Sequence, residues 1–253
     1  MATKRKTTRL RGGEIYAVEE YHDGRYGAPG KHRQKKKKPT REDVQKINAM
    51  NKAKLCQYRL LQYFDSGDYF VTLTYKVDER PPDMETAKQH FRKLMRYIRK
   101  EYKKRGSQLF WIRNIERGTR GAWHIHLVIT RIPETAQIIE DAWNHGGIYL
   151  EQLKKSKYYS EDFAQLAAYI TKSEHTREKK TDGTTAAPRI RESSYSTSRN
   201  MPVPEPRVKK LRRWPREAKP KKGYYIARIH EGINPVTGYK YRRYTMIRLN
   251  RRI

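Results

Sequence analysis

The stretch that decides the fold of this chain is Trp123-His124-Ile125-His126-Leu127-Val128-Ile129. Side chains of a β-strand point alternately to its two faces, so this stretch predicts a strand with both histidines on one face. Trp123, Ile125 and Leu127 then point to the other face, where we expect them to pack in the core. Two histidines on an open strand face are often ordinary surface residues, but they can hold a metal ion if a third ligand lies near.

A carboxylate that could complete such a site precedes the strand. Glu116 ends an apolar run that begins at Leu109, and residues 117–121, Arg-Gly-Thr-Arg-Gly, have the composition of a hairpin loop. A hairpin there would place Glu116 beside both imidazoles. Two imidazoles and one carboxylate suit Mn²⁺ or Mg²⁺ in nucleotide chemistry, and zinc sites use the same ligands, so the ligand set leaves the metal open.

A possible nucleophile lies downstream of the histidines. Residues 163–172 predict a helix, and Tyr169 and Lys172, three residues apart, share one face of it. A tyrosine hydroxyl can attack phosphorus when a metal ion neutralises the phosphate and an ammonium group lies nearby. In a chain with 19 tyrosines, a tyrosine at the edge of the core beside a solvated lysine is the alternative. Tyr158 and Tyr159 are rival nucleophiles by position, but neither has a lysine at one-turn spacing.

Taken together, these residues resemble the motifs of the HUH endonucleases, specifically the rolling-circle replication initiators with a single tyrosine. The three motifs are similar to Phe70-Val71-Thr72-Leu73-Thr74-Tyr75, to Glu116 with His124-Ile125-His126, and to Tyr169-Ile170-Thr171-Lys172. They occur in the order of the family, with the tyrosine after the histidines, and the likeness covers about residues 69–172. Conjugative relaxases of the same superfamily carry the tyrosine before the histidines.

The resemblance implies a fold and an activity. The fold would be α+β, with an antiparallel central sheet flanked by helices in a ferredoxin-like or RRM-like arrangement. The enzyme would nick and rejoin single-stranded or hairpin origin DNA, with Glu116, His124 and His126 holding Mn²⁺ or Mg²⁺. Tyr169 would form a 5′-phosphotyrosyl link, and Lys172 would balance charge or position the tyrosine.

The resemblance also implies a setting. The source would be a bacterial plasmid or small phage, and the protein would act in the cytoplasm of the bacterial host. Because no Gly-x-x-x-x-Gly-Lys-Ser/Thr loop occurs in the sequence, we expect a host helicase to unwind the DNA for a host polymerase. The oligomeric state stays open.

The composition indicates a polyanionic partner. The chain has 253 residues, with 58 Lys and Arg against 27 Asp and Glu, and a formal net charge of +31. Nucleic acid is the expected partner, because neutralising phosphates releases counterions and dominates affinity. A membrane surface is not expected, since no apolar stretch is long enough to span a bilayer. The single cysteine, Cys56, cannot form an internal disulfide, which fits a reducing compartment.

The sequence predicts four segments. These are a largely irregular basic arm over residues 1–39, an endonuclease domain over 40–172, a basic linker over 173–222, and a C-terminal β-hairpin over 223–253. The expected strands of the domain are 69–75, 109–116, 123–129 and 148–150, and its expected helices are 40–63, 84–104, 134–143 and 163–172. We expect Ser160 to be the N-cap of the last helix. The C-terminal hairpin is expected to turn at residues 234–238.

Further residues are candidates for DNA contact. They are Lys35, Lys36, Arg113, Arg120, Arg212, Arg213, Tyr241 and Arg242. Tyrosines interleaved with Lys and Arg in the C-terminal hairpin could stack bases and bind phosphates. A cross-strand aromatic ladder with solvated charges is the equally good alternative.

Three other functions stay open at this point. A single-tyrosine HUH transposase has the same residue order but would cleave transposon-end hairpins. A non-enzymatic basic DNA-binding protein would account for the charge without any nicking. A hydrolytic metal-dependent nuclease would use the same ligands and release free DNA ends.

Overall fold

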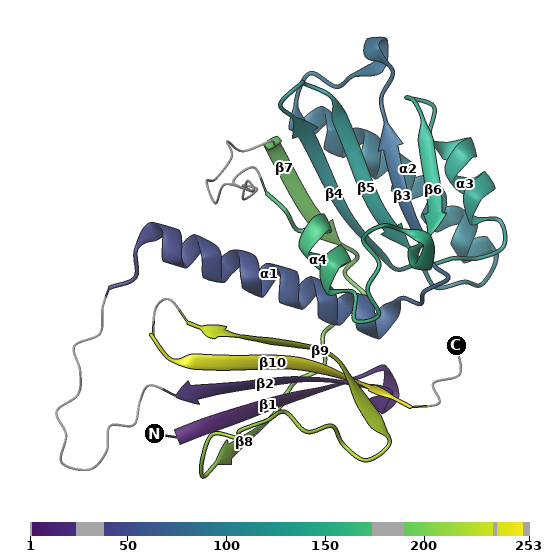
Figure 1. Cartoon of the computed structure of the whole chain (residues 1–253). Helices are drawn as coiled ribbons and strands as arrows, with labels where there is room; N and C mark the ends of the chain where they lie inside the picture. Colours follow the sequence, from purple (N-terminus) through teal and green to yellow (C-terminus); the bar gives the residue numbers. More distant parts are fainter. Residues whose placement is uncertain (1, 24–37, 174–189, 235–236, 250–253) are drawn as a thin grey trace. The chain divides into compact units, whose positions relative to one another are not determined.

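The chain forms two compact units, seen in a computed structural model that describes residues 2–23, 38–173, 190–234 and 237–249 (Figure 1). Unit 1 comprises Met1–Gln62 and Pro202–Ile253, and unit 2 comprises Tyr63–Met201. Each unit contains a five-stranded antiparallel sheet. The predicted α+β class, with an antiparallel sheet flanked by helices, is therefore confirmed. Within the described ranges, no helix is both long and apolar enough to cross a bilayer.

The sheet of unit 2 has the strand order β6-β3-β5-β4-β7. Its strands are β3 (Tyr69–Thr74), β4 (Trp111–Gly118), β5 (Trp123–Ile129), β6 (Ile148–Gln152) and β7 (Ile190–Thr197). Its helices are α2 (Met84–Lys104), α3 (Thr135–Ala142) and α4 (Ala164–Ile170), with short 3-10 turns η2 (Val77–Glu79) and η3 (Leu153–Lys155). α2 and α3 cover one face of the sheet, and α4 lies over the other (Figure 1).

Local sequence explains the helix-covered face. Asp83 caps α2 by accepting a hydrogen bond from the backbone N–H of Thr86, at 2.8 Å. The apolar stripe of α2 is buried against the apolar faces of β3 and β5, which supply Val71, Leu73 and Ile125. Because this packing uses the apolar side of the alternation, the face under α4 is left for polar side chains.

The sheet of unit 1 has the order β8-β1-β2-β10-β9. Its strands are β1 (Ala2–Leu10), β2 (Ile15–Asp23), β8 (Arg207–Leu211), β9 (Tyr224–Ile233) and β10 (Lys240–Arg248), with the 3-10 turn η1 (Arg11–Gly13) after β1. α1 (Arg41–Tyr63) begins after Thr40, whose hydroxyl accepts a hydrogen bond from the backbone N–H of Asp43 at 3.1 Å. Lys54 of α1 forms an ion pair with Glu19 of β2 at 3.0 Å, so α1 packs on one face of this sheet.

Several expectations about the chain ends are corrected. Residues 2–23 form β1 and β2 in place of an irregular arm, and residues 190–197 and 207–211, expected in a linker, form β7 and β8. The expected C-terminal hairpin is present as β9 and β10, but it pairs with β2 inside a sheet. The compact units therefore differ from the four expected segments. The partner strands of β1 and β8 are far apart in sequence, so the pairing that orders these charged strands leaves no local pattern.

Candidate active site

The two histidines of β5 lie on the face of the sheet that α4 covers. Trp123, Ile125 and Leu127 belong to the buried core on the opposite face, as the alternation predicts. The rings of His124 and His126 are parallel to within 4°, with their centroids 6.3 Å apart.

Glu116 reaches this face from β4. It is paired with His124 in the sheet, and its Oε1 lies 3.1 Å from Nε2 of His126. The carboxylate is buried, and its second oxygen, Oε2, has no hydrogen-bond partner within the described ranges. A buried carboxylate oxygen without a partner is costly, so Glu116 retains an open position for a donor or a cation.

Tyr169 comes from α4 and meets the same imidazole. Its hydroxyl lies 3.0 Å from Nε2 of His126. The start of α4 differs from the prediction, because the helix begins at Ala164 after Phe163, whose φ is 53°. Ser160 is therefore not the N-cap, although its hydroxyl still accepts a hydrogen bond from the backbone N–H of Gln165 at 3.3 Å.

Lys172 links the tyrosine to the carboxylate. Its Nζ lies 3.0 Å from Oε1 of Glu116 and 4.1 Å from the centre of the Tyr169 ring. β7 helps to hold this lysine, because the hydroxyl of Ser193 lies 3.0 Å from the Lys172 carbonyl oxygen. The predicted residues Glu116, His126, Tyr169 and Lys172 thus form one cluster, and His124 lies beside it.

Sequence reasoning missed three residues of the cluster. Oγ1 of Thr72 lies 3.1 Å from Nδ1 of His126, and the Phe70 ring is parallel to the His126 ring to within 10°. The Tyr158 ring stacks on the Tyr169 ring with centroids 3.6 Å apart. The alternation of β3 could have placed Phe70 and Thr72 on this face, because they alternate with core residues. No local pattern places Tyr158 there.

The surroundings set the protonation of the cluster. Burial, hydrogen bonding with Tyr158 and the charge of Glu116 all raise the pKa of the Tyr169 phenol. Burial, followed by the charge of His126, lowers the pKa of His124. Burial by itself would raise the pKa of Glu116, but the hydrogen bond and charge of His126 and the charge of Lys172 together lower it. At neutral pH, Tyr169 is therefore protonated, His124 is neutral and Glu116 is ionised.

The chemistry of these donors fits a divalent cation. A neutral imidazole and an ionised carboxylate are suitable ligands, and the unpartnered Oε2 of Glu116 leaves one oxygen for an ion. As the side chains lie, however, the described part of the chain contains no group of three or more His, Cys, Asp or Glu residues positioned to hold a metal. The metal expected at Glu116, His124 and His126 therefore remains a proposal.

Comparison with known proteins supports a role in replication. Residues 68–174 match the model of a family described as Replication-associated protein ORF2. The matched segment contains the whole cluster around His126, and this likeness supports a replication initiator. Neither the comparison with curated proteins nor that with solved structures gave a significant match.

The residues expected to contact DNA fall into three groups. Lys35 and Lys36 lie outside the described residues. Arg113 and Arg242 are buried, and both are engaged within the protein: Arg113 donates to the carbonyl oxygen of Ser194 and Arg242 pairs with Glu20. The remaining candidates are at least partly exposed and open to a ligand, namely Arg120, Arg212, Arg213 and Tyr241.

Proposed function

We propose that this protein is a replication initiator that nicks one strand of origin DNA and later rejoins it, with Tyr169 as the nucleophile. One observation carries the proposal: the Tyr169 hydroxyl lies 3.0 Å from Nε2 of His126, which itself lies 3.1 Å from the Glu116 carboxylate. A phenol held against an imidazole and a carboxylate is unusual among packing tyrosines, and it occurs inside the segment that resembles replication-associated proteins.

The proposed reaction is an in-line attack on a phosphodiester. The Tyr169 oxygen forms a bond to phosphorus and loses its proton to water, while the bond to the 3′-oxygen breaks and that oxygen leaves as a 3′-hydroxyl. The product is a 5′-phosphotyrosyl link. Because this link is again a phosphodiester, a later 3′-hydroxyl can reverse the step and close the strand without an added energy source.

The residues around the tyrosine have separate tasks in this proposal. A divalent cation bound by Glu116, His124 and His126, Mn²⁺ or Mg²⁺, would neutralise charge on the scissile phosphate. The contact with His126 would hold the phenol next to that phosphate. Lys172, whose ammonium lies 4.1 Å from the phenol ring centre, would stabilise the phenolate as it forms. Unwinding by a host helicase and synthesis by a host polymerase belong to the same proposal.

The Tyr169→Phe variant tests the assignment. Full-length protein is incubated with Mn²⁺ and end-labelled single-stranded oligonucleotides that tile a candidate origin, and a denaturing gel reports covalent adducts as shifted bands. We expect an adduct with the parent protein, none with Tyr169→Phe, and equal DNA binding by both. Tyr159→Phe is the matched control, because the Tyr159 ring contacts Phe163 and not the cluster.

Two outcomes would contradict the proposal. An adduct that persists in Tyr169→Phe would mean that another residue, such as Tyr158, is the nucleophile. Free cleaved ends with no adduct in the parent protein would indicate hydrolysis by water at the same site.

A further inference from the structure

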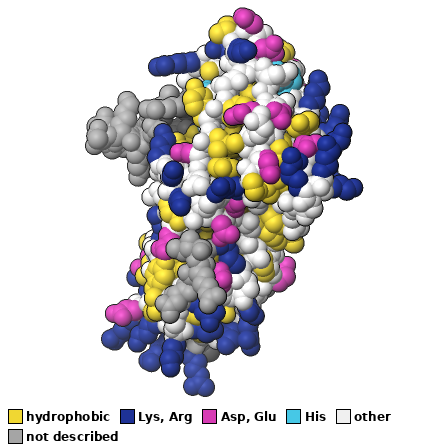
Figure 2. Space-filling view, turned by 90° about the vertical axis from the view of Figure 1, so that its right-hand side faces the viewer, with side chains coloured by type: hydrophobic (Ala, Val, Ile, Leu, Met, Phe, Trp, Pro, Cys, Tyr) yellow, Lys and Arg dark blue, Asp and Glu magenta, His cyan; other side chains and the backbone are white. Residues whose placement is uncertain are grey.

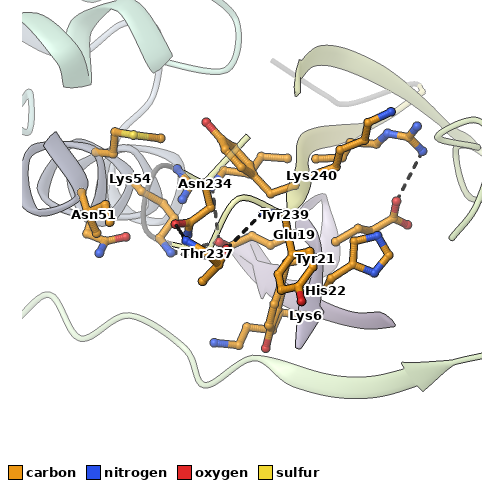
Figure 3. A pocket seen from close by; sticks show the side chains of 16 residues that line it. Lys6, Glu19, Tyr21, His22, Asn51, Lys54, Asn234, Thr237, Tyr239 and Lys240 are labelled. Carbon is orange, nitrogen blue, oxygen red and sulfur yellow. Dashed lines mark hydrogen bonds and ion pairs between the residues drawn. The ribbon is translucent and has the colours of Figure 1, made fainter. Parts of the chain in front are cut away.

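Unit 1 contains a cavity of its own, about 370 Å³ in volume, between α1 and the sheet (Figure 3). Asn51 and Lys54 of α1 line one side, and Tyr21 with other residues of the sheet lines the opposite side. The volume lies in the range of sites for small ligands, about 300–1,000 Å³. No residue of this cavity belongs to the segment that matches the replication-associated family.

The charge of the cavity is positive and only partly compensated. Five cationic side chains and two carboxylates line it. Glu19 pairs with Lys54 at 3.0 Å and Arg243 at 3.5 Å. Lys6 and Lys240, in contrast, have no carboxylate partner among the residues that the structure describes. Two ammonium groups therefore remain available for an anion.

The wall formed by the sheet is aromatic. Tyr21 and Tyr241 are opposite each other in the pairing of β2 with β10, so their rings lie on the same face of the sheet. Nζ of Lys6 lies 5.5 Å from the centre of the Tyr21 ring. The two tyrosines thus offer ring surface directly beside an uncompensated cation.

Gly232 fixes the position of one of these rings. A Cβ at Gly232 would lie 2.8 Å from the Tyr241 hydroxyl and 3.0 Å from two ring carbons, so the ring crosses close over this glycine. His230 lies 3.0 Å from the same hydroxyl through its Nε2. The ring is therefore held in place before any ligand arrives, which lowers the entropic cost of stacking.

Positive charge continues beyond the cavity. Lys209, Lys210, Arg212 and Arg213 are exposed on and after β8, which pairs with β1. Figure 2 shows Lys and Arg side chains gathered at the lower end of the view, the level at which β8 lies in Figure 1. A chain of phosphates leaving the cavity would thus meet further cations on unit 1.

We propose that this cavity binds single-stranded DNA, with a base stacked on Tyr21 or Tyr241 and phosphates at Lys6 and Lys240. Aromatic rings beside cations are what unpaired nucleotides require, because each base exposes a π-face and each linkage carries a charge. A duplex does not fit, since its bases are stacked inside and only phosphates would reach the cavity. The inference does not rest on the nicking activity of unit 2.

Binding of a fluorescein-labelled oligo-dT of about 15 nucleotides to the full-length protein, without metal, tests the proposal. Fluorescence anisotropy at several salt concentrations gives both the affinity and its salt dependence. We expect Tyr21→Leu to weaken binding at least about fivefold with the salt slope unchanged, whereas Tyr21→Phe binds like the parent because it keeps the ring. The double variant Lys6→Gln/Lys240→Gln should reduce the slope by about 1.4, the effect of two lost phosphate contacts on a single strand.

The controls separate this site from general attraction. Lys93→Gln/Lys100→Gln removes the same charge from the exposed face of α2 and should leave the slope nearly unchanged. Gly232→Ala displaces the Tyr241 ring without changing charge and should weaken binding, and circular-dichroism melts establish that each variant is folded. The proposal is overturned if folded Tyr21→Leu binds like the parent, if the two double variants lose equally, or if duplex DNA shows the same losses. None of these results depends on whether Tyr169 forms an adduct.

Discussion

Glu20 and Glu116 are both buried carboxylates on antiparallel sheets, yet their surroundings differ. Glu20 is fully inaccessible in unit 1, and both of its oxygens have partners: Arg5 at 2.6 Å, Arg242 at 3.4 Å and the Tyr244 hydroxyl at 3.4 Å. Glu116 shares one oxygen between His126 and Lys172, while the other has no partner in the described part of unit 2.

The difference indicates two roles for a buried charge. The contacts of Glu20 join residues of β1, β2 and β10, so its charge serves to hold strands from the two ends of the chain together. Glu116 is ionised and buried but incompletely satisfied, an arrangement that stability alone does not favour. Such a group is expected where a cation or substrate completes the site.

The largest effect on stability is expected at Glu20. Glu20→Ala leaves the buried guanidinium of Arg242 without this carboxylate, and unfolding should become easier by about 3–5 kcal/mol. Urea denaturation measures the change. The matched control is Glu231→Ala, which removes the exposed partner of the same arginine and should cost less than about 1 kcal/mol. Equal losses in the two variants would remove the distinction.

Glu116→Gln should reverse this balance between stability and activity. The variant keeps the shape of the side chain and removes the charge, and Lys172, which is 19% exposed, can turn to water. We expect a stability change within about 1 kcal/mol and a fall in adduct formation of about two orders of magnitude. Urea denaturation and the denaturing gel measure the two quantities. A loss of stability like that of Glu20→Ala would make Glu116 a structural residue.

Tyr158 tests how far the site extends beyond the charged groups. Its ring stacks on Tyr169, and an aromatic pair of this kind contributes about 0.5–1.5 kcal/mol. Tyr158→Leu should therefore slow adduct formation by roughly two- to tenfold, while Tyr158→Phe, which retains the ring, stays near the parent rate. Timed quenching of the nicking reaction gives these rates. An equal loss in both variants would point to the hydroxyl of Tyr158 instead of its ring.

His90 asks whether an unpartnered buried atom is enough to mark a site. Its Nδ1 also has no hydrogen-bond partner among the described residues, and its ring stacks on His145 with centroids 4.0 Å apart. Burial, followed by the charge of His145, lowers the pKa of His90. The unfolded chain then takes up the proton first, so stability should fall as the pH drops below about 6.5.

The smallest effect is expected from His90→Gln. Urea denaturation between pH 7.5 and about pH 5 should give a flatter stability profile for the variant than for the parent, with adduct formation unchanged. A loss of adduct formation in folded His90→Gln would extend the functional cluster to the opposite face of the sheet.

Much of unit 2 could be predicted from the sequence because its signals are local. The spacing of apolar residues in α2 and the alternation in β5 depend only on neighbouring residues, and the hairpin of β4 and β5 brings Glu116 to His124 through a short turn. β7 was missed because its ladder with β4 joins residues such as Glu116 and Ser193, which are far apart in the chain. Arg242 was assigned to DNA for the same reason, since its partner Glu20 belongs to the opposite end of the sequence.

The sequence by itself determined that His124 and His126 share a face and that Tyr169 and Lys172 share another, because both follow from the repeat of a strand and of a helix. Only the tertiary structure decided that these faces meet, that Tyr158 stacks on Tyr169, and that the two charged ends of the chain build one sheet around Glu20. Contacts of this kind depend on packing between distant segments, which no local repeat encodes.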